Sequence, residues 1–141
     1  MRTEQKILAL IFKKQNSELK FLALRNNPED PKFGGDFWYV VTGSAEIDES
    51  LEQAVKREIN EETGIEEIWQ IIDVDTIYDY DDPDKDIHYY EHAFLVEVKD
   101  EVKHLNEENI EYKWLNEKDF VKIIRWYGND LIKFIQIAQK Q

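Results

Sequence analysis

The hydrophobic positions in the first third of the chain fall in short runs that are typical of β-strands. Ile7–Phe12 and Leu19–Arg25 are apolar runs separated by six polar residues, a pattern that predicts two antiparallel strands joined by a hairpin. Residues 26–36 contain two prolines and two glycines and predict a loop. The aromatic and β-branched segment 37–41 predicts a third strand, which we expect Gly43 to end.

Helix signals follow in the middle of the chain. Ser50 and Gln53 have the spacing of a capping box and Gly64 supplies a stop, so we expect a helix from about Ser50 to Thr63. These elements predict an α/β fold in which helices cover a mixed sheet, formed as one domain over residues 1–141. Later segments predict strands at 68–78, 88–98 and 111–115, a helix capped by Asn116 and running to Ile124, and a last helix at 129–139.

Composition limits the classes of protein that the chain can represent. Of its 141 residues, 42% are hydrophobic, which is enough for one core. The absence of cysteine excludes disulfides, thiolate metal sites and a cysteine nucleophile. The sequence has neither an apolar run that could cross a bilayer nor the pattern of a secretory signal, so we expect a cytoplasmic protein without a membrane partner.

The charge balance bears on the possible partners. With 18 Lys and Arg against 31 Asp and Glu, the formal net charge is −13, which repels large nucleic acids. A small phosphorylated substrate remains compatible with this charge, because a bound divalent cation can invert the sign of a local site. Solubilising surface charge is the alternative explanation of the acidic excess.

The predicted middle helix carries carboxylates where an ordinary helix carries apolar residues. At about 100° per residue, Glu58 and Glu62 continue the apolar stripe and Glu61 lies at its edge. Three like charges at i, i+3 and i+4 need protons or a cation between them, and Mg²⁺, with Mn²⁺ as a substitute, suits such an oxygen cluster. The alternative is that the helix simply leaves the core here and its glutamates are solvated. The apolar members of the stripe are Leu51, Ala54 and Val55, with Ile59 at the edge.

The spacing around this helix resembles a known family. Gly43, five residues, Glu49, seven residues and then Arg-Glu-Ile-Asn-Glu-Glu-Thr-Gly-Ile at 57–65 resemble the Nudix box, which spans 23 residues here. The resemblance implies an α/β/α sandwich with a mixed sheet between helices. It also implies hydrolysis of a diphosphate linkage in a nucleotide-like small molecule.

The resemblance assigns roles to single residues. Arg57 is expected to pair with Glu49 and orient the cluster, Gly43 to let the backbone approach the metal site, and Gly64 to serve a structural part in the motif. The residues implied as holders of divalent cations are Glu58, Glu61 and Glu62.

Two segments outside the box, 37–46 and 108–115, resemble the branch of dihydroneopterin triphosphate diphosphatases, or dATP pyrophosphohydrolases. Many Nudix members have Pro-Gly-Gly where this chain has Thr-Gly-Ser at 42–44. In that branch, a glutamate at the place of Glu108 completes the metal site or acts as a base, and Glu107 and Glu111 are neighbouring alternatives. The general base stays open among Glu58, Glu61 and Glu108.

These observations leave three functions to distinguish. The first is Mg²⁺-dependent release of pyrophosphate from a nucleoside or pterin triphosphate, and the second is cleavage of a dinucleoside polyphosphate or nucleotide sugar. The third is a binding module without turnover, against which the complete set of helix glutamates argues. Arg25, Trp38 and Tyr39, together with Gly43, are candidate substrate contacts, with buried packing as the alternative for the aromatic residues. The oligomeric state is open, a homodimer included.

Other signals have simpler explanations. His88 and His92 match a zinc-peptidase pattern that works only on a helix, and their surroundings predict a strand, which places them about 13 Å apart. The acidic segment 79–86 lacks the glycine and glutamate of a calcium loop and predicts a solvated loop. Core packing is expected for Trp126, Tyr127, Leu131, Ile132, Phe134 and Ile135.

Overall fold

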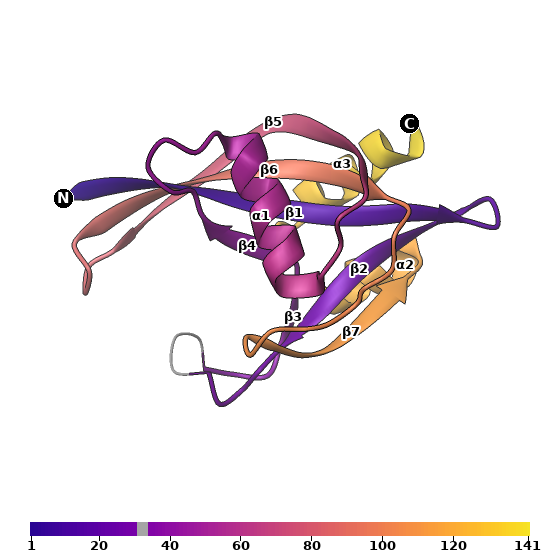
Figure 1. Ribbon diagram of the computed structural model, residues 1–141, viewed down its shortest axis with the longest axis horizontal. Coiled ribbons are helices and arrows are strands. Elements are labelled where there is room, and N and C mark those ends of the chain that lie inside the picture. The colour runs from indigo at the N-terminus through magenta and orange to yellow at the C-terminus, as the bar shows by residue number, and fades with distance from the viewer. Residues whose placement is uncertain (31–33) are drawn as a thin grey trace.

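Strand β1 (Arg2–Gln15) runs through the middle of a mixed sheet in the computed structural model, which describes residues 1–30 and 34–141. It pairs antiparallel with β2 (Glu18–Asn26) at its C-terminal end and with β4 (Val41–Ser44) nearer its N-terminus. Along its other edge, it pairs in parallel with β6 (Ile87–Val98) (Figure 1). The strand therefore connects all parts of the sheet.

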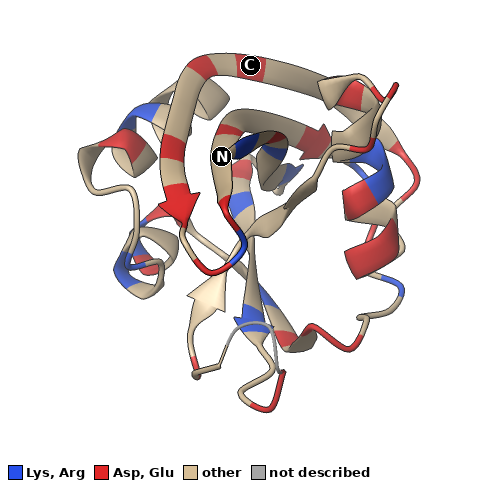
Figure 2. Ribbon diagram, turned by 90° about the vertical axis from the view of Figure 1, so that its left-hand side faces the viewer, with Lys and Arg blue, Asp and Glu red and all other residues tan. Residues whose placement is uncertain are grey.

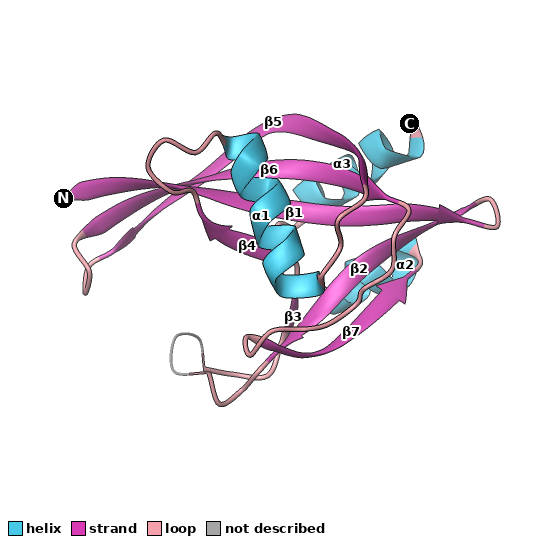
Figure 3. Ribbon diagram, in the orientation of Figure 1, coloured by secondary structure: helices cyan, strands magenta, loops and turns pink. Residues whose placement is uncertain are grey.

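The remaining elements complete a sandwich. β5 (Ile68–Asp82) pairs with β6, while β3 (Trp38–Tyr39) and β7 (Asn109–Leu115) both pair with β2. Helix α1 covers one face of the sheet, and α2 and α3 cover the other (Figure 3). The predicted α/β/α arrangement is confirmed. The helices are α1 (Leu51–Thr63), α2 (Glu117–Ile123) and α3 (Asn129–Gln139).

Both faces of β1 are buried, which explains its continuous apolar run. Odd-numbered residues from Ile7 to Ile11 pack under α1, and even-numbered residues from Leu8 to Phe12 pack under α2 and α3. Successive side chains of a strand point to opposite faces, so one segment contributes to two cores.

The sheet divides next to β1. β2 pairs with β1 only through Phe12–Gln15, and β4 pairs with β1 through Lys6–Ala9. β3 pairs with β2 rather than β1, so the chain passes from one part of the sheet to the other at Val40. The predicted single strand 37–41 is therefore wrong, and Gly43 lies inside β4 instead of ending a strand.

Other boundaries also differ from the sequence predictions. The acidic segment 79–86 is not wholly a loop, because pairing with β6 extends β5 to Asp82 and leaves a short turn at 83–86. His88 and His92 lie in strand β6, as predicted. The predicted loop at 26–36 begins after Asn26, and its residues 31–33 lie outside the described part of the chain.

The C-terminal core prediction holds in part. Leu131, Phe134 and Ile135 form the buried side of α3. Ile132 lies off this side of the helix and is 41% exposed. Trp126 is also 41% exposed, and its ring packs edgewise on Phe37 rather than entering the core. Within the described residues, no helix combines the length and hydropathy needed to span a membrane.

Local signals fix both ends of α1. The Ser50 side chain accepts a hydrogen bond from the Gln53 backbone N–H at 3.0 Å, and the Gln53 side chain accepts one from the Ser50 N–H at 2.8 Å. Gly64 takes the left-handed conformation, with φ 74°, and donates its N–H to the Asn60 carbonyl. The predicted capping box and glycine stop are confirmed.

Replacing Ser50 with alanine removes one half of the capping box, so we expect a loss of about 1 kcal/mol in the free energy of unfolding. Urea unfolding followed by circular dichroism measures this loss. Lys56→Ala, at an exposed position of the same helix, is the matched control and should change stability by less than about 0.5 kcal/mol. Equal losses in the two variants would contradict the capping role.

Candidate active site

A glycine of β4 gives the backbone close access to the Glu58 carboxylate. A Cβ atom added at Gly43 would lie 2.1 Å from the Glu58 Cδ, a distance that real side chains do not reach. Only glycine allows this approach of strand and helix. The structure thereby places the carboxylate of Glu58 directly against the backbone of β4.

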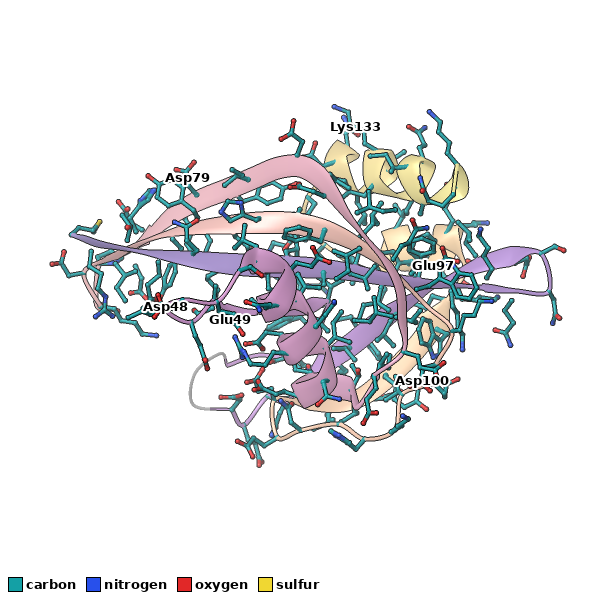
Figure 4. All side chains as sticks on the ribbon, turned by 45° about the horizontal axis from the view of Figure 1, so that its top comes forward. Asp48, Glu49, Asp79, Glu97, Asp100 and Lys133 are labelled. Atoms are coloured by element: carbon teal, nitrogen blue, oxygen red, sulfur yellow. The ribbon has the colours of Figure 1, made fainter. Side chains whose placement is uncertain are left out.

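Arg57 organises the acidic side chains on the solvent side of α1. Its guanidinium donates two hydrogen bonds to Glu49, at 2.7 and 2.9 Å, and one to the Ser44 carbonyl at 2.9 Å. The Nη1 atom of the same group donates to Glu58 at 2.9 Å and to Glu61 at 3.4 Å. Because one guanidinium donates hydrogen bonds to acceptors of both the loop and the helix, it holds the loop before α1 against the helix. Glu49 is labelled near the start of α1 in Figure 4.

This pairing also sets the protonation of Glu49. Hydrogen bonds from the Arg57 side chain and from the Glu46 N–H lower the pKa of Glu49 to about 2. Glu49 therefore stays ionised at neutral pH and remains paired with the Arg57 guanidinium.

Glu62 is the most deeply buried of the helix carboxylates. Only 3% of its surface is exposed, and its Oε1 receives one hydrogen bond, from the Asn109 side chain at 3.4 Å. Its Oε2 is buried and has no hydrogen-bond partner in the part of the chain that the structure describes. Burial, together with the charges of Glu108 and Glu58, holds the pKa of Glu62 well above its usual value. An orphaned buried carboxylate oxygen is a position where a cation fits.

Glu108 joins the cluster from the segment before β7. Its backbone carbonyl accepts a hydrogen bond from the Asn27 N–H at 2.8 Å, which anchors this segment beside the end of β2. Its charge acts on both Glu58 and Glu62 and raises the pKa of each, although burial is the largest cause for both. The structure thus brings together three of the four predicted metal-binding carboxylates.

Glu61 stays apart from this group. Its side chain is 54% exposed and lies toward Arg57. Among the described residues, no three acidic or histidine side chains already surround one ion position. Repulsion between uncompensated carboxylates, together with the pull of Arg57, accounts for the separation. Acidic positions are also spread over other helices, strands and loops (Figure 2), so charge alone does not mark the cluster.

A cavity of about 130 Å³ leads from this cluster through the division of the sheet. Glu62, Glu108 and Asn109 line one end, while Tyr39 and Thr42 belong to the strands on either side of Val40. A larger open groove of about 780 Å³ lies beside α2 and α3, away from the carboxylates. We therefore regard the smaller cavity as the candidate site.

The far end of the cavity contains a residue that the sequence analysis missed. Glu91 of β6 lines it together with Lys6 and Tyr80, and only 5% of the Glu91 surface is exposed. Burial raises the pKa of Glu91, while the Lys6 charge and a hydrogen bond with Tyr80 act in the opposite direction. The sequence feature that could have identified Glu91 is the His-x-x-Glu-His segment, which was interpreted through His88 and His92 alone.

The predicted substrate contacts are divided between two places. Tyr39 lines the cavity, and Gly43 adjoins Glu58. Arg25 and Trp38 line a different, open depression, where Arg25 bonds Asp36 at 2.7 and 2.8 Å and Glu111 at 3.2 Å. The guanidinium of Arg25 is therefore occupied by protein carboxylates.

The comparisons with known proteins agree with this geometry. The family model of the NUDIX domain matches residues 4–134. The chain belongs to the Nudix family. Dihydroneopterin triphosphate diphosphatase of Haemophilus influenzae is 25% identical to this Nudix chain over 139 residues, which cover 91% of the chain and 84% of that protein.

Two solved structures support the Nudix fold. The C. elegans Ap4A hydrolase binary complex matches with a TM-score of 0.72 and 22% identity, over 98% of this chain and 99% of that one. The E. coli dihydroneopterin triphosphate pyrophosphohydrolase matches with a TM-score of 0.68 and 22% identity, over 92% of each chain. The predicted family, branch resemblance and fold are thereby confirmed.

Family membership also fixes the general chemistry. The chain is a Nudix diphosphohydrolase, which acts on phosphoanhydride bonds. Nudix hydrolases generally use divalent metals such as Mg²⁺ and bind small nucleotide-like substrates. The prediction of an enzyme, which the resemblance to the Nudix box implied, is confirmed.

The raised pKa values of Glu62 and Glu58 predict how stability depends on pH in the presence of EDTA. Both groups bind protons more tightly in the folded state, so their stabilising effect is complete below pH 4.5, the usual pKa, and is lost as pH rises through the raised values. We expect the free energy of unfolding to fall less steeply above pH 4.5 in Glu62→Gln than in the wild type.

Urea unfolding at several pH values measures both slopes. Mg²⁺ should reduce the slope of the wild type, because a cation favours the ionised carboxylates. The lowered pKa of Glu49 affects stability only below pH 4.5 and does not interfere. Parallel pH profiles for wild type and variant would contradict a raised pKa of Glu62 in the folded protein.

Proposed function

We propose that this Nudix enzyme is a Mg²⁺-dependent hydrolase that releases pyrophosphate from a triphosphate of the dihydroneopterin triphosphate or dATP type. The observation that carries the proposal is the buried Oε2 of Glu62, which lies without a partner beside the carboxylates of Glu58 and Glu108. In this proposal, residues 1–141 form one Nudix domain that works in the cytoplasm.

The donor set fits a hard divalent cation. Glu58, Glu62 and Glu108 supply oxygen ligands from a helix and a neighbouring segment, and Glu61 can join them by turning away from Arg57. Mn²⁺ is an acceptable substitute. When bound, the cation neutralises phosphate oxygens and lowers the pKa of a nearby water.

The protein residues then have separate tasks. Arg57, fixed by Glu49 and the Ser44 carbonyl, orients Glu58 from the solvent side. Gly43 lets the backbone of β4 approach the Glu58 carboxylate, and hence the proposed metal site, closely. Glu58, Glu61 and Glu108 are the carboxylates available to accept the proton of the attacking water.

The size of the cavity indicates how the substrate lies. Ligand pockets that enclose a whole small molecule measure about 300–1,000 Å³. The cavity here, about 130 Å³, accommodates only one ring system of the substrate. The triphosphate then extends from the ring past Glu62 and Glu108, which also line the cavity, and the similarity to the Haemophilus diphosphatase supports a pterin as the ring.

Glu62→Gln should abolish Mg²⁺-dependent pyrophosphate release, because the amide removes a charged ligand while keeping the shape of the side chain. We expect a fall of at least about 100-fold in kcat, measured by a coupled pyrophosphate assay. Circular dichroism should show an unchanged fold. Glu67→Gln, at an exposed position just beyond α1, is the matched control and should retain full activity.

A substrate panel separates the candidate activities. It contains dihydroneopterin triphosphate, the four dNTPs, oxidised dNTPs, diadenosine tetraphosphate and ADP-ribose, each assayed for its phosphate products. Full turnover by Glu62→Gln, or turnover of diadenosine tetraphosphate or ADP-ribose alone, would refute the proposal.

A further inference from the structure

Glu91 is a buried carboxylate that the proposed mechanism does not use. It lines the same cavity as Glu62, but it lies on the face of the sheet covered by α2 and α3, as do Ala93 and Leu95 of the same strand. Burying a carboxylate is unfavourable unless its oxygens are paired. Such a group in a cavity wall is therefore a candidate for contact with a ligand.

The protein neutralises Glu91 only in part. Lys6 faces it from the parallel neighbour strand, where the two residues are Cα partners, and Tyr80 shares a hydrogen bond with it. Both groups favour the ionised form of Glu91, because a cation and an O–H donor stabilise a carboxylate. An ionised carboxylate has about four lone-pair positions for hydrogen-bond donors, so acceptor sites remain for a ligand.

Glu97 provides the contrast on the same strand. It is equally buried, at 5% exposure, but its Oε1 accepts a hydrogen bond from the Gln70 amide at 2.7 Å. Six residues separate the two glutamates, which is about 20 Å along a strand. In Figure 4, Glu97 is labelled far from Asp79. Asp79 pairs with Tyr90, the residue next to Glu91, so the two glutamates lie in different parts of the molecule. Glu97 lies outside the cavity.

The walls beside Glu91 suit a flat ring. Tyr39 and Tyr80 supply aromatic surface, and Phe37 adds to it nearer the entrance side of the sheet. Burial raises the pKa of Tyr39 to about 12, so its hydroxyl stays protonated. Aromatic walls with one acceptor group at the end favour a heteroaromatic ring that offers donors along its edge.

We propose that Glu91 binds the N–H edge of the substrate ring and thereby selects a 2-amino-4-oxo ring, the edge that guanine and pterin share, over adenine. This inference rests on the proposed function and deepens it. A 2-amino-4-oxo ring presents a ring N–H and an amino group side by side, and both can donate to one carboxylate. Adenine presents an amino group beside an unprotonated ring nitrogen, which leaves one carboxylate oxygen facing another acceptor.

The wild-type enzyme tests the inference without any mutation. dGTP, dITP and dATP carry the same sugar and triphosphate, but dITP lacks the 2-amino group and dATP lacks both the 2-amino group and the ring N–H. We expect kcat/KM to fall in the order dGTP, dITP, dATP, by about tenfold for each lost donor. Dihydroneopterin triphosphate should rank with dGTP or above it. Equal values for dGTP and dATP would overturn the inference.

Glu91→Gln tests the residue itself. Glutamine offers one acceptor and one donor, which matches the adenine edge and mismatches the edge of guanine. We expect kcat/KM for dGTP and dihydroneopterin triphosphate to fall at least about tenfold, mainly through KM, while the value for dATP is unchanged or rises. Glu97→Gln, the matched control on the same strand, should alter none of these ratios.

The remaining outcomes distinguish a failure of ring selection by Glu91 from a failure of the proposed function. An equal loss for all three nucleotides in Glu91→Gln would make the residue structural and refute its role in selection. If the wild type hydrolyses no triphosphate, the proposed function fails. Ring selection is then tested by binding alone, as the thermal shift caused by guanosine or neopterin against that caused by adenosine. A larger shift with the first two, lost in Glu91→Gln, supports the role of Glu91, and equal shifts refute it.

Discussion

Repulsion between carboxylates is the interaction on which the site depends. Burial raises the pKa of both Glu58 and Glu62, and the charge of Glu108 raises the pKa of each further. Arg57 offsets this repulsion at Glu58 by donating a hydrogen bond to it, whereas the buried Oε2 of Glu62 has no hydrogen-bond partner among the described residues. The cluster is thus electrostatically unfavourable, and the proposed cation would relieve it.

The divided sheet converts this local cluster into a binding site. Because β1 pairs with β4 along one stretch and with β2 along another, the polypeptide crosses at Val40 and the two parts of the sheet separate. The cavity follows that separation and reaches from α1 on one face to Glu91 on the other. A continuous sheet would have isolated the two carboxylate groups from each other.

Much of this arrangement follows from local sequence, and the rest does not. The capping box at Ser50, the stop at Gly64 and the glutamate spacing of α1 are short-range patterns, and all of them appear as predicted. Val40 and Glu91 were missed because their surroundings depend on pairings distant in sequence: β3 with β2, and β6 in parallel with β1. Helical geometry placed Glu61 at the edge of the apolar stripe, and the family resemblance placed it among the metal-binding residues. Its side chain instead lies toward Arg57, an ion pair that a helical wheel does not represent.

The hairpin formed by β5 and β6 is separate in sequence from the carboxylate cluster, so the two can change independently. Tyr80 and Glu91, which line the cavity, come from this hairpin, whereas the carboxylates proposed to hold the cation come from α1 and the segment before β7. Substitutions in the hairpin would then change which ring the proposed site accepts, while the carboxylates of α1 and of the segment before β7 stay the same.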